Sequence, residues 1–139
     1  MDDREEPEVA LPRQAAFPEA VGLRLEVSRA LIIGRARQRR FLSYGELAEA
    51  SGVPWRAARR PMNAHLWDVI VWGDARGFPM LSAIVVNKRH LATGDMEDET
   101  LRGFVAAARR LIRYDGSEPR AFLRAQQRAL FDRVARLPE

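Results

Sequence analysis

Cysteine is absent from this sequence of 139 residues, which excludes disulfides, thiolate zinc sites and a cysteine nucleophile. Histidine occurs only twice, so little room is left for a zinc site of another kind. No apolar run reaches the roughly 18 residues that span a bilayer. The acidic opening, MDDREEPE, lacks the basic and then apolar pattern of a secretion signal. We therefore expect a cytoplasmic protein that uses no metal and no cofactor.

Lysine is nearly absent as well, because Lys88 is the only lysine among 23 basic residues. The net charge of +4 is unevenly spread: residues 1–8 hold five acids and one arginine, which leaves a net charge of +8 on the remainder. Arginine favours bidentate contacts with phosphate, and excess basic charge favours an anionic partner such as nucleic acid. GC-rich coding alone also produces such an arginine bias, so charge does not decide between the two explanations.

The chain divides into two regions of different composition. Residues 1–17 are acidic, contain proline and show no apolar period, which is typical of a flexible tail. Such a tail either keeps the protein soluble or lies over a basic surface. Residues 18–139 are long enough to form a single domain with its own core.

Apolar spacing and breaker residues predict mostly helices in this domain. Ser43 and Glu46 have the spacing of a capping box, and the helix they begin is expected to stop near Gly52. Pro54 and Pro61 limit the next helical turn, since proline is not accommodated in a helix interior. Periodicity and these breakers predict helical segments over residues 18–38, 43–52, 55–59, 61–73, 98–113 and 118–136.

One stretch has the composition of a strand. Residues 80–87, MLSAIVVN, are rich in Ile and Val, and a strand needs a partner. The following stretch, RHLATGD, is expected to supply a short return strand or a wing, with Lys88 and Arg89 reaching toward DNA; the alternative for these two cations is a solvated turn. The predicted fold class is α+β and mostly helical: a winged helix-turn-helix core with a short β element and extra C-terminal helices.

A group of arginines surrounds the predicted helix-turn-helix. Seven arginines and two glutamates fall within residues 35–60. Arg56, Arg59 and Arg60 are expected near the start of the second main helix, where free N–H groups and the helix dipole also attract phosphate. Trp55 is suited to act as a wedge or a stacking surface. The alternative is a solvated basic turn in which Trp55 packs as a lid on the core.

The segment SYGELAEASGVPWRAARRPMNAHL, followed by PMLSAIVVN, resembles the C-terminal DNA-binding domain of alkylguanine-DNA alkyltransferases and of the alkyltransferase-like proteins. The patterns compared are TYGELA, AARAVGNAL and PCHRVV, and the similarity covers roughly residues 41–87. The resemblance implies that Tyr44 presses on a DNA phosphate, that Arg59 fills the gap left by a flipped base, and that Asn63 lies in the recognition helix. It also implies that Pro79 opens the strand carrying the reactive site.

The chain departs from that family at the reactive site itself. Met80 stands where the family has its reactive cysteine, and Leu81 and Ser82 replace the histidine and arginine that follow it. Alkyl transfer is excluded because no thiol is present to accept the group. The stretch LSAIVVNK is also similar to one in uncharacterised bacterial proteins, which suggests a bacterial-type protein without implying an activity.

Two other functions remain open. Arg60 and His65 have the R-x4-H spacing of HEPN ribonucleases, although that fold is entirely helical and residues 80–87 favour a strand. Trp67 and Trp72, with the last helix, are candidates for a dimer or hetero-complex surface if they form an exposed aromatic patch. The acids of GDMEDE fit the first turn of a helix better than a calcium loop.

We therefore predict a non-enzymatic protein that binds duplex DNA through a basic helix-turn-helix. The candidate nucleic-acid contacts are Tyr44, Trp55, Arg56, Arg59, Arg60, Asn63, Lys88 and Arg89.

Overall fold

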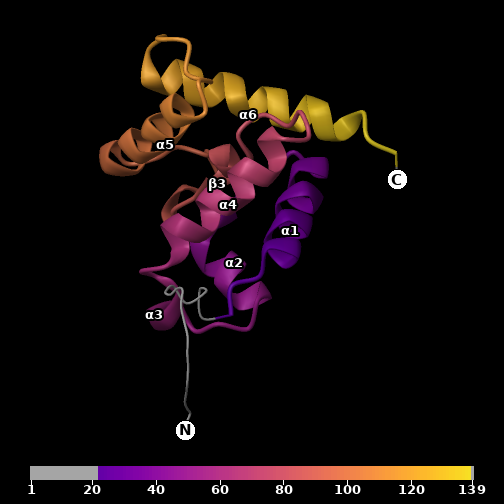
Figure 1. The fold of residues 1–139 in the computed structure, drawn as a ribbon, viewed down its shortest axis with the longest axis vertical. Helices are drawn as coiled ribbons and strands as arrows, with labels where there is room; N and C mark the ends of the chain where they lie inside the picture. Colours follow the sequence, from indigo (N-terminus) through magenta and orange to yellow (C-terminus); the bar gives the residue numbers. More distant parts are fainter. Residues whose placement is uncertain (1–21, 139) are drawn as a thin grey trace, which may run out of the picture.

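The computed structural model describes residues 22–138, and it is mostly helical with one two-stranded parallel sheet (Figure 1). The α-helices are α1 (Leu25–Arg37), α2 (Tyr44–Ala50), α3 (Trp55–Ala58), α4 (Met62–Asp74), α5 (Asp98–Arg110) and α6 (Pro119–Ala135). The strands are β2 (Leu42–Ser43) and β3 (Val85–Val86), and the short 3-10 helices are η2 (Leu81–Ile84) and η3 (Lys88–His90). This confirms the prediction of a mostly helical α+β fold. The predicted tail of residues 1–17 lies outside the described residues. The helix predicted over residues 18–38 is wrong at residues 22–24, because Gly22 has φ of +95° and α1 begins only at Leu25.

A central pair of helices is flanked by other helices at its two ends (Figure 1). Helices α1 and α4 lie side by side in the centre, and α6 crosses one end and contacts α1 and α5. Helix α3 lies at the opposite end, next to α2. The connection from α2 through α3 to α4 is the predicted helix-turn-helix segment.

The predicted capping box is present and fixes the start of α2. Ser43 Oγ accepts the N–H of Glu46 at 3.1 Å, and Glu46 Oε1 accepts the N–H of Ser43 at 2.9 Å. Arg35 of α1 donates to the same Glu46 oxygen at 3.0 Å and to the Phe41 carbonyl at 2.9 Å. One carboxylate therefore caps α2 and holds it against α1.

Glycine and proline then shape the turn as predicted. Helix α2 ends at Ala50, and Gly52 follows with φ of +76°, a conformation that side-chain-bearing residues rarely adopt. Pro54 is the N-cap of α3, and Pro61 is the N-cap of α4. The predictions of a short helical turn and of a main helix that starts near residue 61 are confirmed.

The predicted strand over residues 80–87 is wrong in most of its length. Residues 81–84 form the 3-10 helix η2, and only Val85 and Val86 pair, in parallel, with Leu42 and Ser43. Strand β2 cannot continue beyond Ser43, because Ser43 is already the N-cap of α2. The apolar composition of the stretch instead reflects complete burial, since every residue from 80 to 86 is buried.

The predicted return strand or wing is also not formed. Residues 88–90 form η3, and the Asn87 side chain accepts the N–H of Arg89 at 3.2 Å to cap it. Within residues 22–138 the sheet contains β2 and β3 only, so the winged form of the helix-turn-helix is not seen. The capped turn satisfies the backbone groups locally, which removes the need for a β-hairpin.

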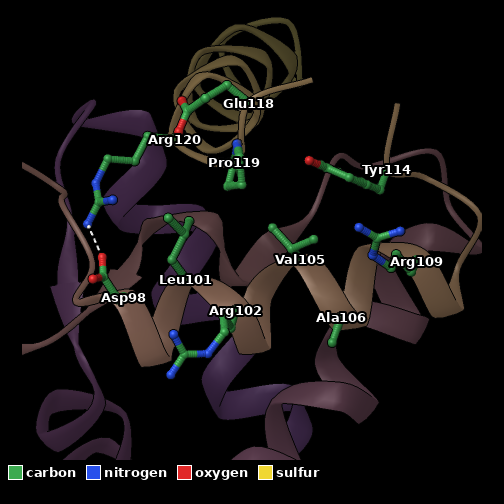
Figure 2. Close-up of a pocket in the computed structure, with 10 residues that line it drawn as sticks. All are labelled: Asp98, Leu101, Arg102, Val105, Ala106, Arg109, Tyr114, Glu118, Pro119 and Arg120. Carbon is green, nitrogen blue, oxygen red and sulfur yellow. Dashed lines mark hydrogen bonds and ion pairs between the residues drawn. The ribbon is translucent and has the colours of Figure 1, made fainter. Parts of the chain in front are cut away.

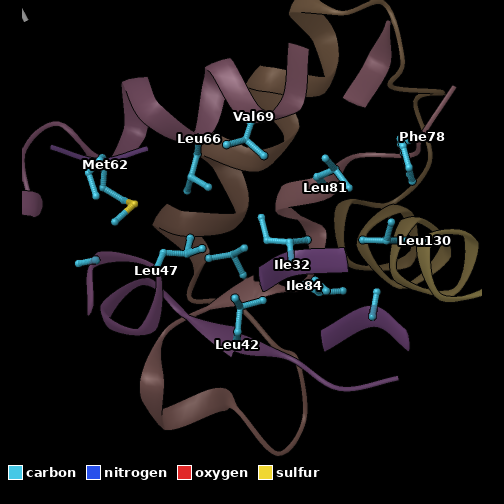
Figure 3. Close-up of a cluster of buried hydrophobic side chains, with 14 of the residues drawn as sticks. Ile32, Leu42, Leu47, Met62, Leu66, Val69, Phe78, Leu81, Ile84 and Leu130 are labelled. Atoms are coloured by element: carbon cyan, nitrogen blue, oxygen red, sulfur yellow. The ribbon is translucent and has the colours of Figure 1, made fainter. Parts of the chain in front are cut away.

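Two apolar clusters make the core. The first joins α1, α2, α4, η2 and α6, and Figure 3 shows its side chains converging between these elements. The second lies between α5, the start of α6 and the buried segment of residues 80–86. Ile32, Leu47 and Val69 in the first cluster, and Leu123 in the second, are fully buried.

A buried glutamine of α6 holds the irregular segments in place. Gln127 is 3% exposed, and its Nε2 donates to the carbonyls of Ala83 at 2.9 Å and Gly94 at 2.8 Å. Gln126 accepts the N–H of Met80 at 2.8 Å. These bonds satisfy backbone groups that regular secondary structure leaves unpaired.

Gly94 is expected to tolerate no side chain. It has φ of +75°, and a Cβ there would overlap the ring of Phe41, which packs against Phe131. Gly77 has a similar φ of +81° with nothing within 4 Å of an added Cβ. Gly94→Ala should therefore lower the free energy of unfolding by about 1–3 kcal/mol more than Gly77→Ala, as measured by urea denaturation. Equal losses for the two variants would show that the Phe41 contact is unimportant.

Candidate nucleic-acid interface

Helix α3 and the start of α4 lie at one end of the molecule (Figure 1). Five polar or aromatic side chains of this segment are exposed. We call this group the α3–α4 basic surface; its residues are Trp55, Arg56, Arg59, Arg60 and Asn63. All five are exposed, and they follow one another within nine positions of the chain. The structure therefore brings together five of the eight predicted contact residues.

Local sequence explains why these side chains face solvent. Helix α3 has only four residues, and of these only Ala58 is buried, at 0% exposed. Only this one small side chain packs on the core, and the arginines on either side of it remain exposed to solvent. In α4 the inward positions are taken by Met62 and His65, which leaves Asn63 on the outside.

The arginines of this surface have no carboxylate partner within the described part of the chain. Six arginines elsewhere form ion pairs with carboxylates, namely Arg24, Arg35, Arg39, Arg89, Arg113 and Arg120. For Arg56, Arg59 and Arg60 there is no ion pair or side-chain hydrogen bond among residues 22–138. Their charge is therefore neutralised by no carboxylate of residues 22–138, and this leaves them available to an anionic group.

Trp55 is not a lid on the core. Its side chain is 43% exposed, and it is the only exposed aromatic residue among those described. Trp55 begins α3, one position before Arg56 and four positions before Arg59. A half-exposed indole next to cations can stack on a base or a sugar.

Tyr44 and Arg89 both lie near Glu97, and Lys88 is the exposed residue before Arg89. Glu97 Oε2 accepts from Arg89 Nε and from His90 Nε2, both at 3.2 Å. Burial, together with the nearby Glu97 charge, raises the pKa of Tyr44 to about 12. The Tyr44 hydroxyl therefore stays protonated well beyond neutral pH.

No hydrogen bond or ion pair of the described residues joins Tyr44, Lys88 or Arg89 to the α3–α4 basic surface. Arg89 is partly neutralised by Glu97, whereas Lys88 is exposed. The organising role of Glu97 was missed from the sequence, because Glu97 is 53 positions away from Tyr44. No local pattern signals such a contact.

His65 is a core histidine and not part of an exposed pair with Arg60. It is 5% exposed, and its Nε2 lies 2.7 Å from the Oγ of Ser28, which is itself 0% exposed. Burial lowers the pKa of His65, against the opposing effect of Asp68. A buried neutral ring cannot reach a scissile phosphate, so the geometry gives no support to an Arg60–His65 ribonuclease.

Trp67 and Trp72 are covered by arginines. Arg110 of α5 lies 3.8 Å from the ring centre of Trp67, and Arg29 and Arg76 lie 4.7 and 4.5 Å from that of Trp72. These cation–π contacts cover the rings. The exposed aromatic patch expected of an interaction module is therefore not formed by these two tryptophans.

A shallow cavity of about 490 Å³ lies between α5 and the start of α6 (Figure 2). Its floor is apolar, with Leu101, Val105 and Pro119, and the ion pair of Asp98 and Arg120 closes one end. Its carboxylates do not converge on one point. Within residues 22–138 no three histidine, aspartate or glutamate side chains are grouped to hold a metal ion.

No family model, curated protein or solved structure matches this chain. Among the helices of the described residues, none combines the length and the apolar character needed to cross a membrane. The assignment of a function therefore depends on the α3–α4 basic surface.

The buried His65 predicts that stability falls in mild acid. The unfolded chain takes up a proton near the ordinary pKa of 6.5, whereas the folded state resists protonation until a lower pH. The free energy of unfolding should therefore decrease as pH falls below about 6.5, by at most about 1.4 kcal/mol per pH unit from this group. Urea denaturation between about pH 7 and pH 5 measures this dependence.

The matched variants are His65→Gln and His90→Gln. The first should have a shallower pH dependence than the unmodified protein, and the second should keep the steeper one, because it retains His65. An unchanged dependence in His65→Gln would contradict the assignment of the buried titrating group.

Proposed function

We propose that the protein binds duplex DNA without catalysing a reaction, and that the α3–α4 basic surface makes the contact. The observation that carries this proposal is the absence of carboxylate partners for Arg56, Arg59 and Arg60 in the described part of the chain. Three adjacent unpaired guanidinium groups are costly in the free protein, and phosphate is the ligand they fit best.

The electrostatic step is the release of counterions from DNA. Each phosphate that an arginine neutralises adds about 0.9 to the negative slope of log affinity against log salt. Contacts from these three arginines give a slope of about −3, which is enough for salt-sensitive binding of modest affinity. Lys88 is assigned to a further backbone contact, and Arg89 to a weaker one because it shares charge with Glu97.

The start of α4 supplies the geometry for reading the groove. Helix α4 has 13 residues, and no side chain caps its first turn, so its positive end faces outward beside Arg60. Asn63 is exposed in that first turn and can bond to an adenine edge in the major groove. In this proposal α4 acts as a recognition helix whose N-terminal residues contact the bases.

The resemblance to alkyltransferase-like proteins supports the same orientation. It places Tyr44 on a phosphate and Arg59 at the position vacated by a flipped base. Arg59 is exposed and unpaired among the described residues, as a side chain that enters a duplex must be. The proposal therefore includes binding to duplexes in which one base is displaced.

Arg59→Ala combined with Arg60→Ala should weaken binding to a labelled duplex by about tenfold or more at about 50 mM salt and reduce the salt slope by about two. Fluorescence anisotropy at several salt concentrations measures both quantities. Arg59 and Arg60 are exposed, so folding stability should change by less than about 0.5 kcal/mol.

The matched control is Arg128→Ala with Arg136→Ala. Both residues are exposed on or just after α6, at the other end of the molecule, and the net charge changes equally. The control should bind DNA with a slope close to that of the unmodified protein. Equal losses in the two double variants would mean that net charge alone governs binding, contrary to the proposal.

Trp55→Ala tests the stacking role. Loss of the indole should weaken binding to single-stranded DNA or to a duplex with a displaced base by about 1–3 kcal/mol, and weaken binding to an intact duplex less. The salt slope should stay unchanged, because no charge is removed. A loss that is the same for all three ligands would show that Trp55 does not contact an unstacked base.

A further inference from the structure

The described chain begins beside the turn that leads to the α3–α4 basic surface. Leu23 is 8% exposed and belongs to the first core cluster, and the Arg24 N–H donates to Ser51 Oγ at 3.1 Å. A Cβ placed on Gly22 would lie 3.3 Å from Val53 Cγ2. Residues 1–21 therefore join the fold at the α2–α3 turn, immediately before Trp55.

Residues 1–8 and the α3–α4 basic surface have opposite charge. Five of these eight residues are acidic, namely Asp2, Asp3, Glu5, Glu6 and Glu8, and they are accompanied only by Arg4. The surface offers three guanidinium groups that no described carboxylate neutralises. Residues 1–8 are thus acidic, whereas the rest of the chain carries a net charge of +8.

The connecting segment is long enough for the two to meet. Fourteen residue steps separate Glu8 from Gly22, and such a length spans at most about 50 Å when fully extended. Tethering on this scale gives a local concentration in the millimolar range. A weak electrostatic contact is therefore sufficient to keep the surface occupied at low salt.

We propose that the acidic segment of residues 1–8 occupies the α3–α4 basic surface when DNA is absent and competes with the DNA backbone for it. This inference rests on the proposed function of that surface. The segment then acts as an internal anion that lowers affinity for non-specific DNA, whereas a ligand with additional base contacts displaces it. A tail that only promotes solubility has no such effect on the surface.

The first test measures the contact without DNA. The full chain is compared with the variant D2N/D3N/E5Q/E6Q/E8Q, each in the unmodified and the R59A/R60A background. Iodide quenching of tryptophan fluorescence at low salt reports on Trp55, which is the exposed tryptophan, and its signal is isolated by subtracting that of the matching Trp55→Phe protein. Neutralising the segment should raise the Trp55 quenching constant by about twofold or more, because the anion iodide gains access to the arginines.

This increase should largely disappear in the R59A/R60A background. An increase of the same size there would overturn the inference, since it would reflect the general field of the protein. No increase in either background would overturn it too.

The second test measures competition with DNA using the same four proteins. Neutralising the segment should tighten binding to a random-sequence duplex by about fivefold, as expected when roughly four fifths of the surface is occupied. In the R59A/R60A background, neutralising the segment should leave the affinity for the duplex nearly unchanged, with a ratio of about one. DNA binding with no gain from neutralisation would overturn the inference and leave the proposed function standing; a quenching change with no DNA binding by any of the four proteins would support the contact and refute the proposed function.

Discussion

The Glu46 carboxylate makes the interaction on which the arrangement of α2, α3 and the start of α4 depends. It accepts the Ser43 N–H that starts α2 and a guanidinium hydrogen of Arg35 from α1. The same Arg35 group closes the turn after α1 through the Phe41 carbonyl. The direction of α2 is therefore fixed before the chain reaches the turn, and the positions of α3 and the start of α4 follow from it.

Arginine serves two physical purposes in this protein. Most arginines are structural: they pair with carboxylates, bond to carbonyls or lie over aromatic rings, as Arg29 and Arg76 do over Trp72. A guanidinium group suits these roles because it is planar and weakly hydrated. The arginines of the α3–α4 basic surface make no such contact among residues 22–138, and the same holds for Arg40, Arg102, Arg128 and Arg136, which lie at separate places in the chain. The α3–α4 basic surface is set apart because its three unpaired arginines fall within five positions of the chain.

Local signals in the sequence were sufficient to predict the succession of α2, α3 and α4 and the residues of the α3–α4 basic surface. The capping box, the glycine with positive φ and the two prolines act over three or four residues, so the sequence alone reveals them. Exposure of Arg56 and Arg59 follows from the same local geometry. These are the features on which the functional proposal depends.

Features set by distant contacts could not be predicted. Residues 80–87 have the composition of a strand, yet their partner strand is cut short by the N-cap at Ser43, and α6 satisfies the backbone through Gln127. His65 has the spacing of a catalytic pair with Arg60, but Ser28 on another helix makes it a core residue. Periodicity indicates that a side chain is buried without indicating its partner.

The most direct test of the central claim is the salt dependence of duplex binding by the unmodified full chain. Anisotropy titrations with a random-sequence duplex, between about 50 and 200 mM salt, give the slope of log affinity against log salt. We expect measurable binding at the lower salt concentration and a slope of about −2 to −4, as the unpaired arginines require. No binding at about 50 mM salt, or a slope close to zero, would contradict the claim that this surface binds DNA.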